Sequence, residues 1–237
     1  MIRYSIVLPA YNEEKQIRDT IVKITEFFEN RQEQIEILVV DDGSMDATVR
    51  TVESIGYDIR ILKNTRNLGK GESVRRGILA SKGEYILFSD VDLSVPLSFF
   101  PTMLETLANG VDVVIASRRH HGSRIVVPQS SLRAGMGILF NTLVRFTLLP
   151  GMHDTQCGLK GFTRNSASEI FKRISVTGWC FDVEALVIAK ELGYTVEEIS
   201  VDWYNSTVSK VRPLHTLFQI CRDLPKILMK RRIGKYR

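Results

Sequence analysis

Two aspartates separated by one valine, Asp90 and Asp92, follow the apolar run YILF at residues 85–88. Such a run is typical of a buried strand, so the two carboxylates would lie where that strand leaves the core. Like charges this close repel each other and are costly to desolvate unless a cation or water compensates them. The pair therefore predicts either a solvated turn or a site for a divalent cation.

Basic residues gather in two segments that contain no acid, one between Asp112 and Asp154 and one after Asp223. The chain as a whole has a net charge of +5, from 32 basic and 27 acidic residues. The first segment contains Arg118, Arg119, Arg124, Arg133 and Arg145. Such clusters favour phosphates, nucleic acid or lipid headgroups, although a solvated basic face has the same composition. No nucleic-acid-binding motif accompanies the charge, so nucleic acid is not an expected partner.

Regularly spaced apolar runs in the first half of the chain predict βαβ units. The predicted strands are residues 4–8, 35–40, 59–62, 84–88 and 111–116, and the helices between them are 13–29, 46–55, 70–81 and 97–109. This alternation predicts a mainly parallel sheet flanked by helices. The second half is less regular, with helices at 129–149, 165–173, 181–192 and 213–231 and strands at 158–163 and 195–201. Without a repeat or a linker, residues 1–237 are predicted to form a single domain.

The ends of these strands carry most of the residues that could do chemistry. Ligands of open α/β sheets bind beyond the carboxyl ends of the strands. Those ends are PAYNEE (9–14), DDGSMDAT (41–48), SDVDLS (89–94) and the basic SRRHH (117–121). Carboxylates opposite a basic segment suit Mg²⁺ or Mn²⁺ bridged to a nucleoside diphosphate. The glycine patterns of a dinucleotide fold and of a P-loop are both missing, since PAYNEE has no glycine and Lys70 is followed by Gly71.

Four ordered motifs resemble a known family. VLPAYNEE (7–14), VVDDGSMDAT (39–48), NLGKGESVRRGI (67–78) and SDVDLS (89–94) are similar to the family 2 glycosyltransferases of the GT-A fold. Three later motifs, DTQCGLKGF (154–162), WCFDVEAL (179–186) and SVDWYNSTVSKVRP (200–213), look like the dolichyl-phosphate β-glucosyltransferase branch. The resemblance implies a Rossmann-like sheet, with a nucleotide-sugar-binding half (1–120), an irregular acceptor-binding half (121–212) and a basic amphipathic tail (213–237).

The resemblance also implies a reaction. It is the inverting, metal-dependent transfer of glucose from UDP-glucose to a polyprenyl (dolichyl) phosphate, which gives a β-linked lipid-phosphate sugar. The alternatives are another donor, such as GDP-mannose or UDP-GlcNAc, or a hydroxyl acceptor such as a growing saccharide. A catalytically silent nucleotide-binding or scaffold protein is a further alternative, which the intact pair of Asp90 and Asp92 disfavours.

Individual roles follow from the same resemblance. Asp90 and Asp92 would hold the Mg²⁺ or Mn²⁺ ion, and Asp92 would be its direct, catalytic ligand. Arg118 and Arg133 would bind the acceptor phosphate, whose geometry a planar guanidinium matches. Asp182 would be the catalytic base for a hydroxyl acceptor, or a positioning group for a phosphate that is already an anion. The nucleotide sugar would be bound by Pro9, Tyr11, Glu13, Asp42, Lys70, Asp90, Arg118 and Lys210.

Several of these residues have simpler readings that the sequence leaves open. Asp41 and Asp42 are also good helix caps, and Lys70 suits a surface position at a helix start. Arg133 could snorkel from an interfacial helix. Asp182 is an acid of the kind that the dipole favours in the first turn of a helix.

Residues 132–149 are apolar but interrupted by Arg133, Asn141 and Arg145. The pattern predicts a helix lying in a membrane interface rather than crossing it, or else an ordinary core or dimer helix. The basic tail would add attraction to an anionic leaflet. Three widely spaced cysteines indicate a reducing compartment, and the N-terminus leads directly into a strand without a signal peptide. We therefore expect a peripheral protein on the cytoplasmic face of a membrane.

Overall fold

The computed structural model describes residues 3–206 and 213–237, and its centre is a seven-stranded sheet. The strands lie in the order β3-β2-β1-β4-β7-β5-β8. Their bounds are β1 (Tyr4–Ala10), β2 (Ile35–Asp41), β3 (Ile59–Lys63), β4 (Tyr85–Ser89), β5 (Val113–Ser117), β7 (Leu159–Thr163) and β8 (Val196–Ser200). Neighbouring strands are parallel except where β7 pairs with β4 and β5. The mainly parallel sheet expected from the sequence is therefore confirmed.

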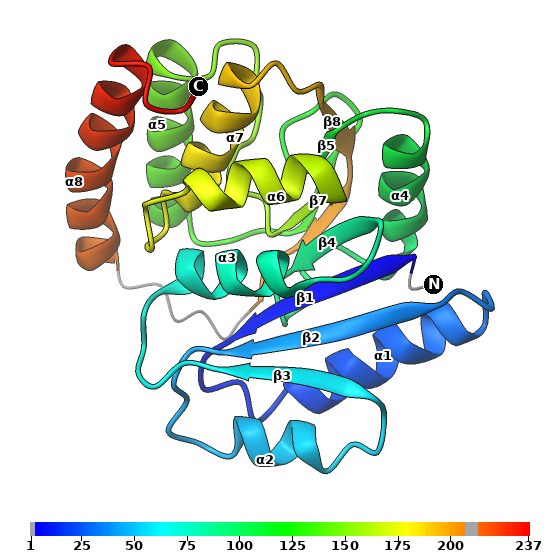
Figure 1. Ribbon diagram of the computed structural model, residues 1–237. Coiled ribbons are helices and arrows are strands. Elements are labelled where there is room, and N and C mark those ends of the chain that lie inside the picture. Colours follow the sequence, from blue (N-terminus) through cyan, green and yellow to red (C-terminus); the bar gives the residue numbers. More distant parts are fainter. Residues whose placement is uncertain (1–2, 207–212) are drawn as a thin grey trace.

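Helices cover both faces of this sheet (Figure 1). One face is covered by α3 (Lys70–Ala80), α6 (Arg164–Arg173) and α7 (Phe181–Glu191). The other face is covered by α1 (Ile17–Glu29), α2 (Thr48–Glu53) and α4 (Phe100–Ala108), which the short 3-10 helix η1 (Leu97–Phe99) precedes. Helices α5 (Ser131–Thr147) and α8 (Pro213–Arg232) extend the first layer beside α7.

The two-sided burial explains why the strands read as continuous apolar runs. In β1, Ile6 and Leu8 pack into the core on the side of α1 and α4, whereas Val7 packs under α3. All three side chains are fully buried. A parallel strand buried on both faces favours apolar residues at consecutive positions, not only at alternate ones.

Two helices begin later than their sequence pattern predicts. Helix α1 begins at Ile17 instead of residue 13, and α2 begins at Thr48 instead of residue 46. The loops after β1 and β2 bond to each other: Asn12 N donates to Ser44 Oγ (2.8 Å) and Glu13 N donates to Thr48 Oγ1 (2.7 Å). These side chains give partners to two backbone N–H groups ahead of α1 and fix the two loops at the carboxyl edge of the sheet.

A small second sheet was not expected from the sequence. Strand β6 (Arg124–Val127) pairs in parallel with β9 (Asp202–Tyr204). Every residue of β6 is exposed, so the strand lacks the alternation of buried and exposed residues that sequence patterns detect.

Helix α5 presents an apolar surface to the solvent. Ile138, Leu139, Leu143 and Phe146 are all exposed, and the side chain of Phe146 is 87% exposed. Leu139, Leu143 and Phe146 are four and three residues apart, so they share one face of the helix. Within the described residues, no helix combines the length and the apolar content that a membrane span requires.

Candidate active site

The loops that follow β1, β2 and β4 meet at one edge of the sheet, because these strands are parallel neighbours. The edge includes Pro9 at the end of β1 and Tyr11 and Glu13 in the loop behind it. Glu13 Oε2 accepts a hydrogen bond from Gln16 Nε2 (2.5 Å). This hydrogen bond helps to fix the loop. That Pro9, Tyr11 and Glu13 contact the nucleoside stays a prediction.

Asp90 and Asp92 lie in a tight turn directly after β4. Val91, between them, is buried, and its carbonyl accepts a hydrogen bond from Thr20 Oγ1 (2.5 Å). This anchor holds the turn, and both carboxylates remain partly exposed on its other side. Asp92 Oδ1 accepts hydrogen bonds from Ser94 N (3.0 Å) and Ser94 Oγ (2.7 Å). Burial, followed by the charge of Asp90, raises the pKa of the Asp92 carboxyl.

The Asp90 carboxylate packs against a glycine of the neighbouring strand segment. Asp90 N donates to the carbonyl of Gly158 (3.1 Å). A Cβ added at Gly158 would overlap Asp90 Oδ2. The absence of a side chain at residue 158 is therefore what leaves room for the Asp90 carboxylate.

Lys70 is not a surface lysine. Its Nζ lies 2.5 Å from Asp90 Oδ1 and 5.5 Å from the ring centroid of Trp179. Burial lowers the pKa of the Lys70 ammonium, but the carboxylates of Asp90 and Asp182 outweigh this effect and the pKa is raised. The ammonium is thus a fixed positive charge beside the aspartate pair.

The start of α3, where Lys70 lies, is held against the loop before α7. Gly71 N donates to the carbonyl of Thr177 (2.8 Å). A Cβ at Gly71 would stand 2.8 Å from that oxygen and 2.7 Å from Phe181 Cβ. Only glycine lets the two segments approach this closely.

Asp42 supports the same helix from the other side. Its buried carboxylate accepts hydrogen bonds from Asn64 Nδ2 (2.7 Å), Leu68 N (2.8 Å) and Gly69 N (2.9 Å). Asp42 therefore fixes the loop that leads into α3, and neither it nor Asp41 caps α2 with a side chain. A contact between Asp42 and the nucleoside stays a prediction.

Asp182, in the first turn of α7, is paired with a lysine that the sequence analysis missed. Lys160 Nζ lies 2.8 Å from Asp182 Oδ1, and the two buried side chains form an ion pair. Lys160 is fully buried in β7, and its ammonium also donates to the carbonyl of Cys157 (2.7 Å). Burial raises the pKa of the Asp182 carboxyl, against the opposing charges of Lys160 and Lys70.

Arg118 directly follows β5 and forms a bidentate ion pair with Asp154. Its Nε donates to Asp154 Oδ2 (2.6 Å) and its Nη2 donates to Asp154 Oδ1 (2.9 Å). The guanidinium also lies 5.4 Å from the ring centroid of Trp203. Burial opposes ionisation of Asp154, but the Arg118 guanidinium holds the pKa of that carboxyl below its usual value. Nη1 has no partner in the part of the chain that the structure describes, and remains available to an anion.

Two predicted site residues are not brought into this cluster. Arg133, in α5, is partly buried and makes no hydrogen bond or ion pair with the described residues. Lys210 lies outside the described residues. Their phosphate-binding roles stay predictions.

The charges of the cluster suit an oxygen-liganded cation. The turn after β4 carries the carboxylates of Asp90 and Asp92, which are hard oxygen ligands of the kind that Mg²⁺ and Mn²⁺ prefer. No group of three His, Cys, Asp or Glu residues among the described ones could hold a metal by itself. An ion bound here would need further oxygens from water or from a substrate phosphate, which is the usual situation for Mg²⁺ beside a nucleotide.

Comparison with known proteins agrees with this geometry. The family model described as glycosyl transferase family 2 matches residues 5–171. Dolichyl-phosphate β-glucosyltransferases from Homo sapiens and Dictyostelium discoideum are 34% and 33% identical to the chain, over 98% of its length and 77% and 76% of theirs. The relative of the same name from Saccharomyces cerevisiae is 32% identical over 98% of the chain and 76% of its own length.

Solved structures share the fold. A glucosyl-3-phosphoglycerate synthase from Mycobacterium tuberculosis, crystallised with Mn²⁺ and UDP, has a TM-score of 0.67 at 20% identity and covers 97% of this chain and 79% of that one. A mannosyl-3-phosphoglycerate synthase from Rubrobacter xylanophilus has a TM-score of 0.72 at 21% identity, over 99% of this chain and 75% of that one. At these identities the likeness speaks for the fold, and the expected GT-A fold is confirmed.

Proposed function

This chain belongs to glycosyl transferase family 2, and we propose that it transfers glucose from UDP-glucose to a polyprenyl (dolichyl) phosphate. The observation that carries this proposal is the identity of 32–34% with three dolichyl-phosphate β-glucosyltransferases over 98% of the chain. The reaction is a single displacement. An oxygen of the lipid phosphate bonds to the anomeric carbon, the bond to UDP breaks with its electron pair leaving on UDP, and the configuration inverts from α to β.

On the donor side, Asp90 and Asp92 would hold Mg²⁺ or Mn²⁺ together with the diphosphate. When bound, the ion neutralises the charge that develops on the leaving diphosphate. Lys70 adds a second positive charge at the same edge, held in place by its contacts with Asp90 and Trp179. The nucleoside would lie against the loops of Pro9, Tyr11, Glu13 and Asp42, and Lys210 would approach the diphosphate.

On the acceptor side, Arg118 would grip the lipid phosphate, with help from Arg133. Asp154 holds two of the three guanidinium nitrogens of Arg118 and orients the third. A phosphate is already an anion at neutral pH and needs no general base. Asp182, paired with the buried Lys160, would then position the reacting groups and not remove a proton.

The exposed apolar face of α5 supports a peripheral place on a membrane, which we propose to be the cytoplasmic face. Leu139, Leu143 and Phe146 would enter the interface, where the polyprenyl chain of the acceptor lies. The basic end of α8 would add attraction to anionic lipids.

The proposal is tested by sugar transfer into an organic-extractable product. Purified protein with Mn²⁺ or Mg²⁺ and a short polyprenyl phosphate is offered UDP-glucose, GDP-mannose and UDP-GlcNAc in parallel, with Asp92→Ala as the control. We expect metal-dependent labelling from UDP-glucose that Asp92→Ala abolishes. Labelling from another donor would keep the reaction and replace the sugar.

A hydroxyl acceptor is the second candidate, and one observation favours it. Burial raises the pKa of Asp182, which is the direction that suits a general base. Nucleotide release with a saccharide acceptor, and none with a polyprenyl phosphate, would replace the proposed acceptor with this one.

A further inference from the structure

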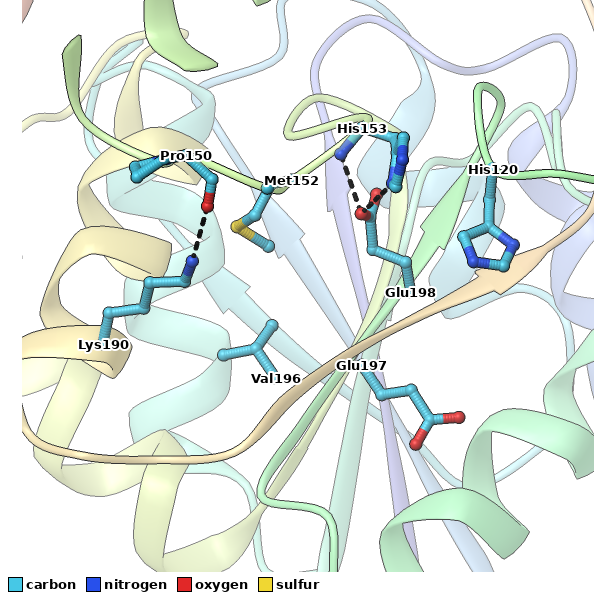
Figure 2. A pocket seen from close by; sticks show the side chains of 9 residues that line it. His120, Pro150, Met152, His153, Lys190, Val196, Glu197 and Glu198 are labelled. Atoms are coloured by element: carbon cyan, nitrogen blue, oxygen red, sulfur yellow. Dashed lines mark hydrogen bonds and ion pairs between the residues drawn. The ribbon is translucent and has the colours of Figure 1, made fainter. Parts of the chain in front are cut away.

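Glu198, on the edge strand β8, holds the turn at residues 153–154. Its Oε2 accepts hydrogen bonds from His153 N (2.7 Å) and pairs with the His153 ring Nδ1 (2.8 Å), and its Oε1 accepts one from Asp154 N (2.9 Å). The side chain of Glu198 is only 10% exposed. Figure 2 shows Glu198 pointing toward His153 at the side of a cavity of about 310 Å³. A carboxylate bonded to two backbone N–H groups fixes the position of that backbone.

Asp154 in turn fixes the position of Arg118 through hydrogen bonds. Besides the two guanidinium bonds, Asp154 Oδ2 accepts a hydrogen bond from the backbone N of Arg118 (3.0 Å), and Asp154 Oδ1 accepts one from Gln156 N (3.1 Å). Asp154 is 2% exposed, so its carboxylate has no room to move away. Both the main chain and the side chain of Arg118 are therefore set by the place of Asp154.

The two carboxylates thus connect the outer edge of the sheet with the acceptor side of the site. Strands β5 and β8 are parallel neighbours with Ile115 opposite Glu198, and Arg118 follows β5 directly. Glu198 itself makes none of the contacts that hold Asp90, Asp92 and Lys70. A change at Glu198 should therefore reach the acceptor side and leave the donor side unaltered.

We propose that Glu198 is a positioning residue for the acceptor phosphate, acting through the 153–154 turn and Asp154 on the guanidinium of Arg118. This inference rests on the proposed phosphate-binding role of Arg118. The negative charge and the two oxygens are both needed. In Glu198→Gln, one oxygen becomes an NH₂ group that faces a donor, whichever way the amide turns, so at least one backbone hydrogen bond is lost.

Glu197 provides a matched control on the same strand. It is exposed and makes no hydrogen bond or ion pair within the described residues. Figure 2 shows its side chain pointing away from His153. Glu197→Gln therefore makes the same change of charge one residue away, without touching the turn.

The test compares KM for a short polyprenyl phosphate with KM for UDP-glucose in both variants. Glu198→Gln is expected to raise KM for the acceptor about tenfold, the factor for one hydrogen bond to a charged group. KM for UDP-glucose should stay within about twofold, and Glu197→Gln should change neither. If Glu198→Gln raised KM for the acceptor and KM for UDP-glucose equally, Glu198 would have a general structural role and the proposal would be overturned.

A double-variant cycle identifies the route. Arg118→Ala should raise KM for the acceptor, and adding Glu198→Gln to it should have almost no further effect. A full tenfold effect of Glu198→Gln in the Arg118→Ala background would overturn the route through Arg118. If Arg118→Ala raised KM for the acceptor and Glu198→Gln did not, only the role of Glu198 would be overturned. The proposed function would stand.

Hydrogen exchange gives a readout that needs no activity. The amide hydrogens of His153, Asp154 and Arg118 should exchange faster in Glu198→Gln than in Glu197→Gln, because each is bonded within this chain of carboxylates. Unchanged exchange at Arg118 would sink the inference even if no sugar transfer were detected. If Glu198→Gln does not fold, Glu198→Asp replaces it in all of these experiments. Aspartate keeps the negative charge but is one methylene shorter, so the carboxylate is drawn back from the 153–154 turn.

Discussion

Lys160 Nζ and Asp182 Oδ1 lie 2.8 Å apart with both side chains buried, near enough to Asp90 for its charge to act on Asp182. A buried charge is tolerated only when it is paired, so each of the two residues depends on the other. The pair also decides how much basic character Asp182 keeps, because the neighbouring ammonium stabilises its ionised form.

Removing only the lysine should destabilise the protein strongly. Lys160→Met leaves the Asp182 carboxylate buried without its partner, and the free energy of unfolding should fall by about 3–5 kcal/mol. The double variant Lys160→Met/Asp182→Asn removes both charges and should recover most of this loss. Urea unfolding of the wild type, the single variant and the double variant measures these free energies. A double variant as unstable as Lys160→Met would contradict the pairing.

Asp182→Asn separates the two acceptor classes. With a lipid phosphate as acceptor, kcat should fall less than about tenfold, because no proton has to be removed. A general base would instead contribute about a hundredfold or more. Initial rates with saturating substrates decide this, and a fall of that larger size would assign proton removal to Asp182.

Gly158→Ala should disturb the aspartate pair without unfolding the chain. The added Cβ overlaps Asp90 Oδ2, so the carboxylate must move, and transfer should fall by about tenfold to a hundredfold. The control is Gly135→Ala in α5, where a Cβ meets nothing within 4 Å. Rates and thermal unfolding are measured for both. Equal activity of the two variants would show that residue 158 has no influence on the site.

Acid should weaken the contact between Asp154 and Arg118. The pKa of Asp154 lies below its ordinary value of 3.8, so its ionised form stabilises the fold at neutral pH. This contribution is fully present above the unfolded-state pKa and is lost as the pH falls through the folded-state pKa. Asp154→Asn should therefore be less stable than the wild type at neutral pH, and the difference should narrow below about pH 4.

The exposed pair of Asp202 and Arg124 serves as the control for this measurement. It has the same chemistry, with Arg124 Nε donating to Asp202 Oδ1 (2.7 Å), but lies at the surface. Exposed ion pairs contribute little, so Asp202→Asn should leave the unfolding free energy nearly unchanged across the same pH range. A larger effect of Asp202→Asn than of Asp154→Asn would reverse our ranking of the two pairs.

The apolar face of α5 should govern binding to lipid. Phe146→Ser is expected to reduce sedimentation with vesicles that contain anionic lipid severalfold, because it removes the most exposed aromatic ring of that face. Met45→Ser removes a side chain that is equally exposed, at 86%, but lies in the loop after β2, and should change nothing. Identical binding by both variants would remove α5 from the lipid contact.

The sequence pattern predicted the first half of the fold well because its strands are buried on both faces and stand out as apolar runs. It did not predict β6 and β9, because β6 is exposed at every position and β9 has only three residues. It also placed the starts of α1 and α2 too early, because the contacts of Asn12 and Glu13 with the next loop override a helical pattern.

The place of Asp90 and Asp92 in the turn after β4 was predictable, because the apolar run YILF marks the strand that precedes them. Lys160 was not, because its partner Asp182 is 22 residues away and the two meet only through the register of β7, which sets Lys160 opposite Phe88. The bond between Arg118 and Asp154 spans 36 residues and is hidden for the same reason. A buried lysine inside the apolar run GLKGF is nevertheless a signal that an acid must lie nearby.

The position of β7 has a consequence for the order in which the molecule can assemble. This strand lies between β4, which Asp90 and Asp92 follow, and β5, which Arg118 follows, so the sheet joins β4 to β5 only through it. During synthesis, the first 120 residues would emerge with a gap in the middle of their sheet, filled only once residues 159–163 have followed. The two parts of the sheet on either side of β7 are thus joined by a single late strand, and neither can become a separate module without breaking the sheet of the other.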